Sequence, residues 1–212
     1  MKNQIVISTL AALMIISGCK AQSTSSNNNV KNRKNMERTT EKFDTATYYM
    51  NRKGFDYQFE NYSKGKVRQF GGDRGSNYIE YARKKDELFG ICKEYYYKTK
   101  TLKIVGKYFH NRFNAGIWKR YDEDGYLIEE YDQDAPYKNY PWEKIEKFIK
   151  KELKLDLFDK KTDVGVSRSV DDKTGIPMWN ITWRPGDAKV HFVDIDANTG
   201  KVVERGANDI EK

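Results

Sequence analysis

The chain has 212 residues and a formal net charge of +8, and only 38% of its residues are hydrophobic although 14% are aromatic. This length is enough for one domain of ordinary size or two small ones, and aromatic side chains bury so much area each that they favour a β-rich protein with an aromatic core. A basic, aromatic chain could bind nucleic acid, but the sequence holds no RNA- or DNA-binding motif, so we exclude nucleic acid as a partner; the N-terminal residues described next support this exclusion.

The first 18 residues have the features of a signal peptide. A positively charged start at Met1–Lys2 is followed by the apolar stretch Ile5–Ile16, which is too short to span a bilayer comfortably. The sequence ISGC that ends at Cys19 then resembles the lipobox of bacterial lipoproteins. The resemblance implies that the leader is cut before Cys19 and that its thiol carries acyl chains such as palmitate, which anchor the protein to a membrane. The alternative is a buried N-terminal helix with an incidental cysteine.

The residues after Cys19 predict where the protein lies and how it is attached. Enterobacterial lipoproteins that stay in the inner membrane carry Asp at the position of Lys20, so the resemblance implies the outer membrane, on its periplasmic or its surface face. Residues 19–42 are rich in Ser, Thr, Asn, Lys and Arg and cannot bury enough surface to offset their ordering entropy, so we predict a disordered tether. Cys92 is then the only thiol of the folded part, and it is interpreted as a small buried residue.

The following segments predict a short helix, a strand and a turn. Residues 43–50 could form a short helix, and aromatic and polar residues alternate over residues 55–62 (FDYQFENY) as in a strand. The glycine-rich stretch 71–75 (GGDRG) lacks the Gly-Lys-Ser/Thr ending of a phosphate-binding loop, so it is interpreted as a turn.

The central segment contains a repeat with a spacing of 26 residues. Gly90 in GICKEYYYKTKTLKIVGKY matches Gly116 in GIWKRYDEDGYLIEEYD, and each unit predicts a strand, a polar turn and a second strand. The pattern resembles the variant MORN-like repeats of bacteria, and the resemblance is carried by Gly116, Trp118, Tyr121, Gly125 and Leu127. The first unit is degenerate, because Cys92 replaces the tryptophan. In its turn, Thr99 replaces the glycine, for which a positive φ costs little.

Residues 43–135 are therefore expected to form an antiparallel β meander, and the resemblance implies an antitoxin-like or immunity-like protein that masks a toxin. Aromatic residues of the repeats are candidates for a protein-binding surface, because Tyr and Trp give a large contact area with few rotatable bonds. The candidates are Tyr95, Tyr96, Tyr97, Trp118 and Tyr121. One face of a sheet cannot hide three consecutive tyrosines, so we expect a second layer from the C-terminal helix, with solvent or a partner as the alternatives.

Residues 136–212 predict a helix followed by antiparallel strands. Pro141 suits the first turn of a helix, and apolar residues recur at helical spacing from Trp142 to Leu155. Strands are predicted at 164–170, 178–184, 189–196 and 201–205, and alternation in the second of them places Trp179, Ile181 and Trp183 on one face. The order of elements, with VDIDANTGKVV joining the last two strands, resembles the PepSY-like domain over residues 141–206. That resemblance implies regulation or inhibition of a peptidase.

The residue types that commonly bind metals or act in catalysis do not occur in a recognised motif. Asp194, Asp196 and Asn198 have the spacing that opens an EF-hand loop, but position 199 is Thr instead of glycine and position 205 is Arg instead of glutamate. The two histidines, His110 and His191, lack further ligands at zinc-site spacing, and no Gly-x-Ser-x-Gly elbow is present. We therefore predict no catalytic residues, no metal, no cofactor and no enzyme activity.

The sequence as a whole predicts an α+β protein, mainly an antiparallel meander of degenerate hairpin repeats followed by a module of one helix and an antiparallel sheet. Its expected role is that of an envelope lipoprotein with a non-catalytic protein-binding module. Regulation of an envelope peptidase, and binding of anionic lipid or polysaccharide through the lysines, are the alternatives.

Overall fold

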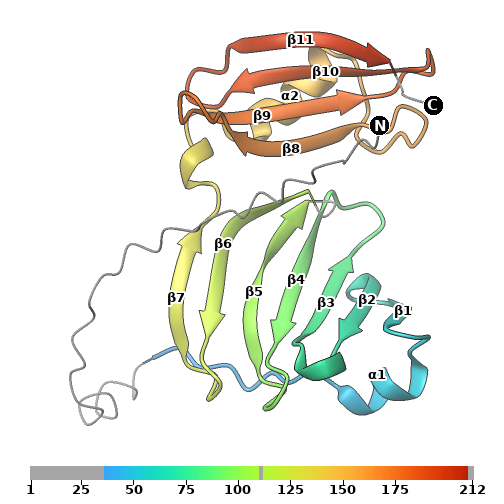
Figure 1. Ribbon diagram of the computed structural model, residues 1–212, viewed down its shortest axis with the longest axis vertical. Coiled ribbons are helices and arrows are strands. Elements are labelled where there is room, and N and C mark those ends of the chain that lie inside the picture. The colour runs from blue at the N-terminus through green and yellow to red at the C-terminus, as the bar shows by residue number, and fades with distance from the viewer. Residues whose placement is uncertain (1–35, 110–111, 210–212) are drawn as a thin grey trace, which may run out of the picture. The chain divides into compact units, whose positions relative to one another are not determined.

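The computed structural model describes residues 36–109 and 112–209. Cys19, the leader, tether residues 19–35 and His110 lie outside the described residues, so the expectations about them remain predictions. The described part of the chain forms two antiparallel β-sheets and two α-helices (Figure 1), which confirms the predicted α+β class at this level.

Seven strands form the first sheet, and each strand pairs antiparallel with the next one along the chain. The strands are β1 (Asp56–Asn61), β2 (Gly65–Gly71), β3 (Tyr78–Arg83), β4 (Phe89–Tyr95), β5 (Leu102–Phe109), β6 (Phe113–Tyr121) and β7 (Leu127–Asp132). The two repeat units of the sequence are the β4–β5 and β6–β7 hairpins, as predicted. The short helix α1 (Thr45–Asn51) precedes β1, and the carboxylate of Asp44 caps it by accepting a hydrogen bond from the Thr47 amide.

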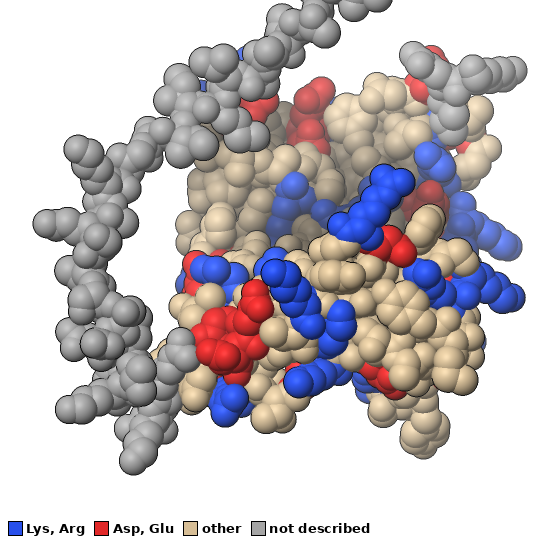
Figure 2. Space-filling model, turned by 60° about the horizontal axis from the view of Figure 1, so that its bottom comes forward, with Lys and Arg blue, Asp and Glu red and all other residues tan. Residues whose placement is uncertain are grey.

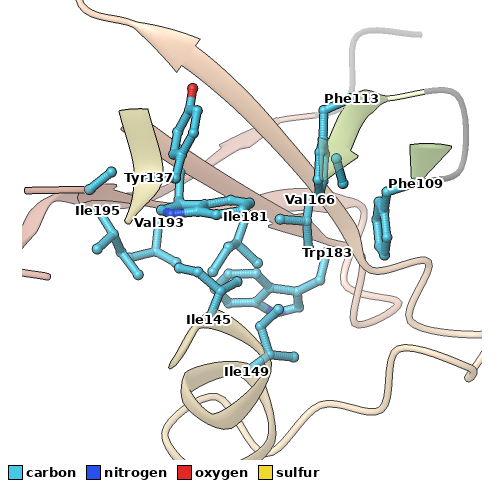
Figure 3. Packing of buried hydrophobic residues seen from close by; sticks show 13 residues of the cluster. Phe109, Phe113, Tyr137, Ile145, Ile149, Val166, Ile181, Trp183, Val193 and Ile195 are labelled. Carbon is cyan, nitrogen blue, oxygen red and sulfur yellow. The ribbon is translucent and has the colours of Figure 1, made fainter. Parts of the chain in front are cut away.

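The second sheet has four strands in the order β11-β10-β9-β8, with helix α2 (Trp142–Lys151) against one face. The strands are β8 (Gly165–Val170), β9 (Pro177–Trp183), β10 (Lys189–Asp196) and β11 (Val202–Asp209). Figure 3 shows Ile145 and Ile149 of the helix pointing into the cluster formed by the buried residues of the sheet. Trp179, Ile181 and Trp183 are buried, which confirms the predicted apolar face.

The hairpin turns of the two repeat units differ by one residue. In the second unit Gly125 has a φ of 87°, and an added Cβ would lie 2.2 Å from the carbonyl oxygen of Thr39, so only glycine fits. In the first unit the positive φ of 63° belongs to Lys100 and not to Thr99. The predicted correspondence is therefore wrong by one residue, because the extra residue of this turn precedes Lys100. The hydroxyl of Thr99 is buried without a hydrogen-bond partner.

In the turn between β10 and β11, the carboxylate of Asp196 accepts hydrogen bonds from other residues of the same turn. One carboxylate oxygen of Asp196 accepts hydrogen bonds from the amides of Asn198 and Thr199, and the other accepts one from the Thr199 hydroxyl. Gly200 closes the turn with a φ of 73°. These contacts agree with the interpretation of this stretch as a hairpin turn instead of a calcium loop.

Residues 36–43, which we call the strap, cross the turn end of the first sheet (blue in Figure 1). Four backbone hydrogen bonds of 2.9–3.0 Å join the strap to the β4–β5 and β6–β7 hairpins. Phe43 at its end is buried and stacks on Tyr78, with ring centroids 4.5 Å apart. The predicted tether is therefore wrong for residues 36–42, which belong to the ordered fold because backbone hydrogen bonds join them to the hairpins.

The strap and α1 also supply the second layer that the consecutive tyrosines require. Tyr95 is 2% exposed and packs in one cluster with Phe43 and Tyr48. The expected second layer from the C-terminal helix is wrong for these tyrosines, because α2 packs in a different cluster with the four-stranded sheet.

On the opposite face of the first sheet, large rings cover glycines of neighbouring strands. An added Cβ on Gly106 would lie 2.2 Å from the indole of Trp118, and one on Gly90 would lie 2.5 Å from the ring of Tyr108. Both rings are buried although the sheet is a single layer there. The glycines thus allow a thin sheet to bury aromatic side chains without a second layer.

Arg168 of β8 connects the two sheets through an aromatic cage. Its side chain is 7% exposed. Its guanidinium carbon lies 4.3–4.5 Å from three ring centroids, those of Phe113, Tyr137 and Trp179. A cation that is removed from water in this way gains from the negative faces of the rings, by about 2 kcal/mol or more in total.

Hydrogen bonds complete the environment of this guanidinium. Arg168 donates from Nη1 to the carbonyls of Asn114 and Gln133 at 2.9 and 3.2 Å, and from Nη2 to the Asp134 carboxylate at 2.7 Å. Its Nε is buried without a partner. These acceptors lie on β6 and just after β7, so one side chain of the second sheet is bonded to two segments at the end of the first sheet.

We predict that Arg168→Ala lowers the free energy of unfolding by about 3 kcal/mol, because it leaves a carboxylate and two carbonyls without their donor. The matched control is Arg184→Ala, which removes an exposed arginine that lies 3.5 Å from Asp163 and should change stability by less than about 0.5 kcal/mol. Urea denaturation measures both. Equal effects of the two substitutions would contradict the structural role assigned to Arg168.

Candidate functional site

The structure places most of the predicted surface aromatics inside the fold. Tyr95, Trp118 and Tyr121 are 2%, 6% and 4% exposed. Tyr96 is half-buried, and its hydroxyl donates to the carbonyl of Tyr121. Tyr97 is the most accessible of the five, with 36% of its surface exposed. These residues mainly hold the repeats together, so a recognition site has to be sought elsewhere on the described surface.

Cys92 and His191 occupy structural environments. Cys92 is buried, and this burial raises the pKa of its thiol to about 11, so the reactive thiolate is scarce at neutral pH. Nε2 of His191 lies 2.8 Å from a carboxylate oxygen of Asp187, and the histidine ring packs beside Trp183. Within residues 36–109 and 112–209, no cluster of three or more His, Cys, Asp and Glu side chains could hold a metal ion.

A cleft of about 750 Å³ lies between the first sheet and helix α2. Its apolar lining comes from Leu88, Phe89, Ile91, Trp142 and Phe158. Two of these side chains remain open to solvent: Ile91 is 38% exposed and Phe158 is 52% exposed. An apolar concavity of this size with charged groups around it is the usual setting of a binding site.

Charged side chains of β3, β4 and β5 and of the β1–β2 turn reach the same cleft. Its cationic lining consists of Lys64, Arg83, Lys84, Lys93 and Lys107. Glu80, which also lines the cleft, is only 4% exposed and accepts hydrogen bonds from Lys64 Nζ at 2.8 Å and from Gln69 Nε2 at 2.7 Å. These two donors satisfy a carboxylate that would otherwise be costly to bury.

The strap contributes a carboxylate that shares a lysine with the cleft. One oxygen of Glu41 accepts hydrogen bonds from Lys93 Nζ and from the Tyr95 hydroxyl, both at 2.7 Å. Burial raises the pKa of Glu41, but the hydrogen bonds from Lys93 and Tyr95 outweigh this effect, so the pKa lies below its usual 4.5. A smaller cavity of about 290 Å³, lined by Glu41, Lys64 and Glu80, adjoins this contact.

The second repeat unit makes the same contact without a cleft. Glu37 accepts hydrogen bonds from Lys119 Nζ at 2.7 Å and from the Tyr121 hydroxyl at 2.8 Å. The hydrogen bond from Lys119 is the main cause of a lowered Glu37 pKa. Each unit thus presents a Lys-x-Tyr pair to one glutamate of the strap, and Lys119 does not line the cleft. The pairing of two Lys-x-Tyr motifs with Glu-x-x-x-Glu was the signal in the sequence that could have located the strap.

Charge is mixed on the face of the molecule that Figure 2 shows. Figure 2 shows Lys and Arg side chains interspersed with Asp and Glu side chains instead of gathered in one basic patch. Residues 1–35 contain five of the 39 basic residues and no acidic one, so residues 36–212 carry 34 basic and 31 acidic residues, a formal charge of +3. Most of the net positive charge therefore belongs to residues 1–35.

Comparisons of the chain with protein-family models, with curated proteins and with solved structures found no match. No helix in the part of the chain that the structure describes has the length and apolar character needed to cross a bilayer. The geometry itself is suited to binding: an apolar cleft with lysines on the strand side, next to a strap whose acidic side chains use one of those lysines.

The hydrogen bonds that Glu41 accepts from Lys93 and Tyr95 predict that the free energy of unfolding depends on pH. Glu41→Gln should lower the free energy of unfolding at neutral pH by about 1 kcal/mol, the size of one hydrogen bond to a charged group discounted for partial exposure. Because the pKa of Glu41 is lowered by folding, this contribution is fully present above pH 4.5 and is lost as pH falls through the folded pKa.

Urea denaturation of both proteins between neutral pH and about pH 3 measures this difference. The stabilities should converge at the acidic end. A difference that stays constant or grows as pH falls would show that Glu41 does not act through its charge.

Proposed function

We propose that this protein is an envelope-anchored, non-catalytic binding module whose cleft holds a segment of a protein partner. The observation that carries the proposal is the cleft of about 750 Å³ with Ile91 and Phe158 left partly exposed beside Trp142. Aromatic and aliphatic side chains in a concave, partly desolvated place are typical anchors of protein interfaces.

The charges of the cleft favour a peptide segment over an anionic lipid or polysaccharide surface. The lining contains both signs: basic residues on the strands, and Asp86, Glu87 and Glu146 elsewhere. A membrane or polyanion would be attracted to a continuous basic face, and the net charge of residues 36–212 is only +3. The basic tether is the part of the chain that suits contact with anionic headgroups.

Two kinds of protein partner follow from the family resemblances. The variant MORN-like repeats support a toxin, which an immunity-like protein would mask. The PepSY-like segment supports an envelope peptidase, which the protein would regulate or inhibit. The cleft is lined by residues of the β4–β5 repeat hairpin and by Trp142 and Glu146 of α2, so both segments contribute to the same site in either case.

The anchor is tested at Cys19. Cells that are fed labelled palmitate should incorporate label into the wild-type protein, and Cys19→Ser should abolish both the label and membrane association, because the thioether-linked lipid is lost. The protein with Cys92→Ser, which lacks the buried thiol instead, is the matched control and should be labelled normally. Absence of label from the wild-type protein would contradict the envelope assignment.

The cleft is tested by photocrosslinking in living cells. A photoreactive amino acid at Ile91, in the cleft, should trap one defined protein, whereas the same amino acid at Ile128 on β7 should not. Ile128 is a fair control because it is 47% exposed and does not line the cleft. The trapped protein, once purified, should bind Ile91→Asp at least about ten-fold more weakly than Ile128→Asp. Equal adducts at both positions, or none at Ile91, would contradict the proposed site.

A further inference from the structure

We infer that the cleft takes an acidic segment of its partner, and that the carboxylate this segment brings competes with Glu41 of the strap for Lys93, which loosens the strap. This inference rests on the proposed function, because it specifies the ligand of the same cleft. It specifies the chemical class of the ligand, which has an anionic group next to an apolar side chain. It also specifies a consequence of binding, the loosening of the strap.

The lysines of the strand side define where the anionic group would lie. Lys93 and Lys107 are on the neighbouring strands β4 and β5, and both line the cleft. Lys107 is exposed and forms no ion pair with any residue that the structure describes. The neighbouring Lys64 is already used by the buried Glu80. An anion entering the cleft therefore finds one available ammonium group at Lys107 and a second, at Lys93, that is held by the strap.

The apolar lining of the cleft indicates that the ligand carries an apolar side chain beside its anionic group. Phe89, Trp142 and Phe158 line the same cleft as the lysines, so a bound segment can bury an apolar side chain while its carboxylate faces β4 and β5. The acidic residues of the cleft are Glu80 on β3, Glu146 on α2, and Asp86 and Glu87 in the turn before β4. The carboxylate of Glu80 already accepts hydrogen bonds from Lys64 and Gln69. The other three oppose an anion on their side and favour its placement near Lys93 and Lys107.

Competition at Lys93 follows from electrostatics. Its ammonium lies 2.7 Å from Glu41, its side chain is 20% exposed, and it lines the cleft. A second carboxylate at the same ammonium shares its attraction and repels Glu41, and this repulsion is stronger in a partly desolvated site than in water. Occupancy of the cleft therefore weakens the contact that holds the middle of the strap.

The strap is attached weakly enough to respond. Its residues 36–42 are mostly exposed. Two carboxylates and four backbone hydrogen bonds hold it, and Arg38 adds a hydrogen bond of 3.0 Å to the carbonyl of Asp124, until Phe43 enters the core. Loss of one of the two carboxylate contacts should therefore raise the population of the detached strap. Because coupling between two sites is reciprocal, removing the charge of Glu41 should strengthen binding in the cleft by the same factor.

The second repeat unit supplies the matched control. Glu37 makes the same pair of hydrogen bonds as Glu41, but its lysine, Lys119, does not line the cleft. Glu37→Gln and Glu41→Gln remove one strap carboxylate each, with the same change in charge. Only the Glu41 substitution is expected to alter binding in the cleft.

The experiment uses the soluble chain from residue 20 and two synthetic hexapeptides, one with Phe between two Glu residues and one with both Glu replaced by Gln. Binding is followed by the indole N–H resonance of Trp142. The Glu peptide should bind more tightly than the Gln peptide. Glu41→Gln should strengthen binding of the Glu peptide on the order of five-fold, whereas Glu37→Gln should leave it unchanged. Amide exchange at Thr39 should rise when the Glu peptide is added.

Each contrary outcome has a distinct meaning. Equal binding of both peptides would overturn the anionic ligand while leaving the cleft as a binding site. Tighter binding of the Glu peptide with equal effects of Glu37→Gln and Glu41→Gln, or without faster exchange at Thr39, would overturn the coupling to the strap. Binding of neither peptide would overturn the inference about ligand chemistry, whereas the proposed binding site is judged separately, by the comparison of crosslinking at Ile91 and Ile128 in cells.

Discussion

The caged guanidinium of Arg168 is the interaction on which the candidate site depends. It is a buried cation that reaches from β8 to three acceptors on β6 and after β7, and three aromatic rings surround it. The cleft has one wall on the first sheet and another on α2, which packs against the second sheet. A contact that fixes one sheet against the other therefore also fixes the width of the cleft. Apolar contacts act together with it: Phe89 and Phe109 of the first sheet pack on Trp142 of α2, with ring centroids 5.2 and 4.8 Å apart. The hydrogen bonds of Arg168 add directional specificity to this packing.

The strap makes the same side-chain contacts with both repeat units: each Lys-x-Tyr pair donates hydrogen bonds to one glutamate. The Lys-x-Tyr pairs of β4 and β6 are two strands apart, a distance of about 10 Å across a sheet. The glutamates that receive them are four residues apart, which spans about 13 Å in an extended chain. The strap can therefore cross the strands obliquely and still place Glu37 and Glu41 on successive units. Tyr hydroxyls that would otherwise be buried unsatisfied gain acceptors in the same step.

Local patterns explain why much of the fold could be predicted. Alternation in residues 55–62, the repeat from Gly90 to Asp132 and the apolar face of Trp179, Ile181 and Trp183 each depend on neighbours in sequence, and the strands appear where expected. The strap could not be found in this way. Its sequence, ERTTEKF, is polar and has no helical or strand period, so it is indistinguishable from a tether until Glu37 and Glu41 meet partners more than fifty residues away. The cleft was missed for the same reason, because Ile91 and Phe158 come together only in the folded chain.

The burial of the repeat tyrosines changes where recognition is expected. Aromatic composition alone suggested that Tyr95 and Tyr121 face a partner, but their hydroxyls are bonded to the strap and their rings are covered. In a thin sheet without a deep core, such rings are needed for stability, and only side chains beyond the reach of the strap and of α1 remain free for binding. Ile91 is on the same strand as Tyr95, four residues before it, and remains partly exposed in the cleft. Under the proposed function, the Tyr95 end of β4 serves stability and the Ile91 end serves binding, and Lys93 between them contacts Glu41 of the strap and also lines the cleft.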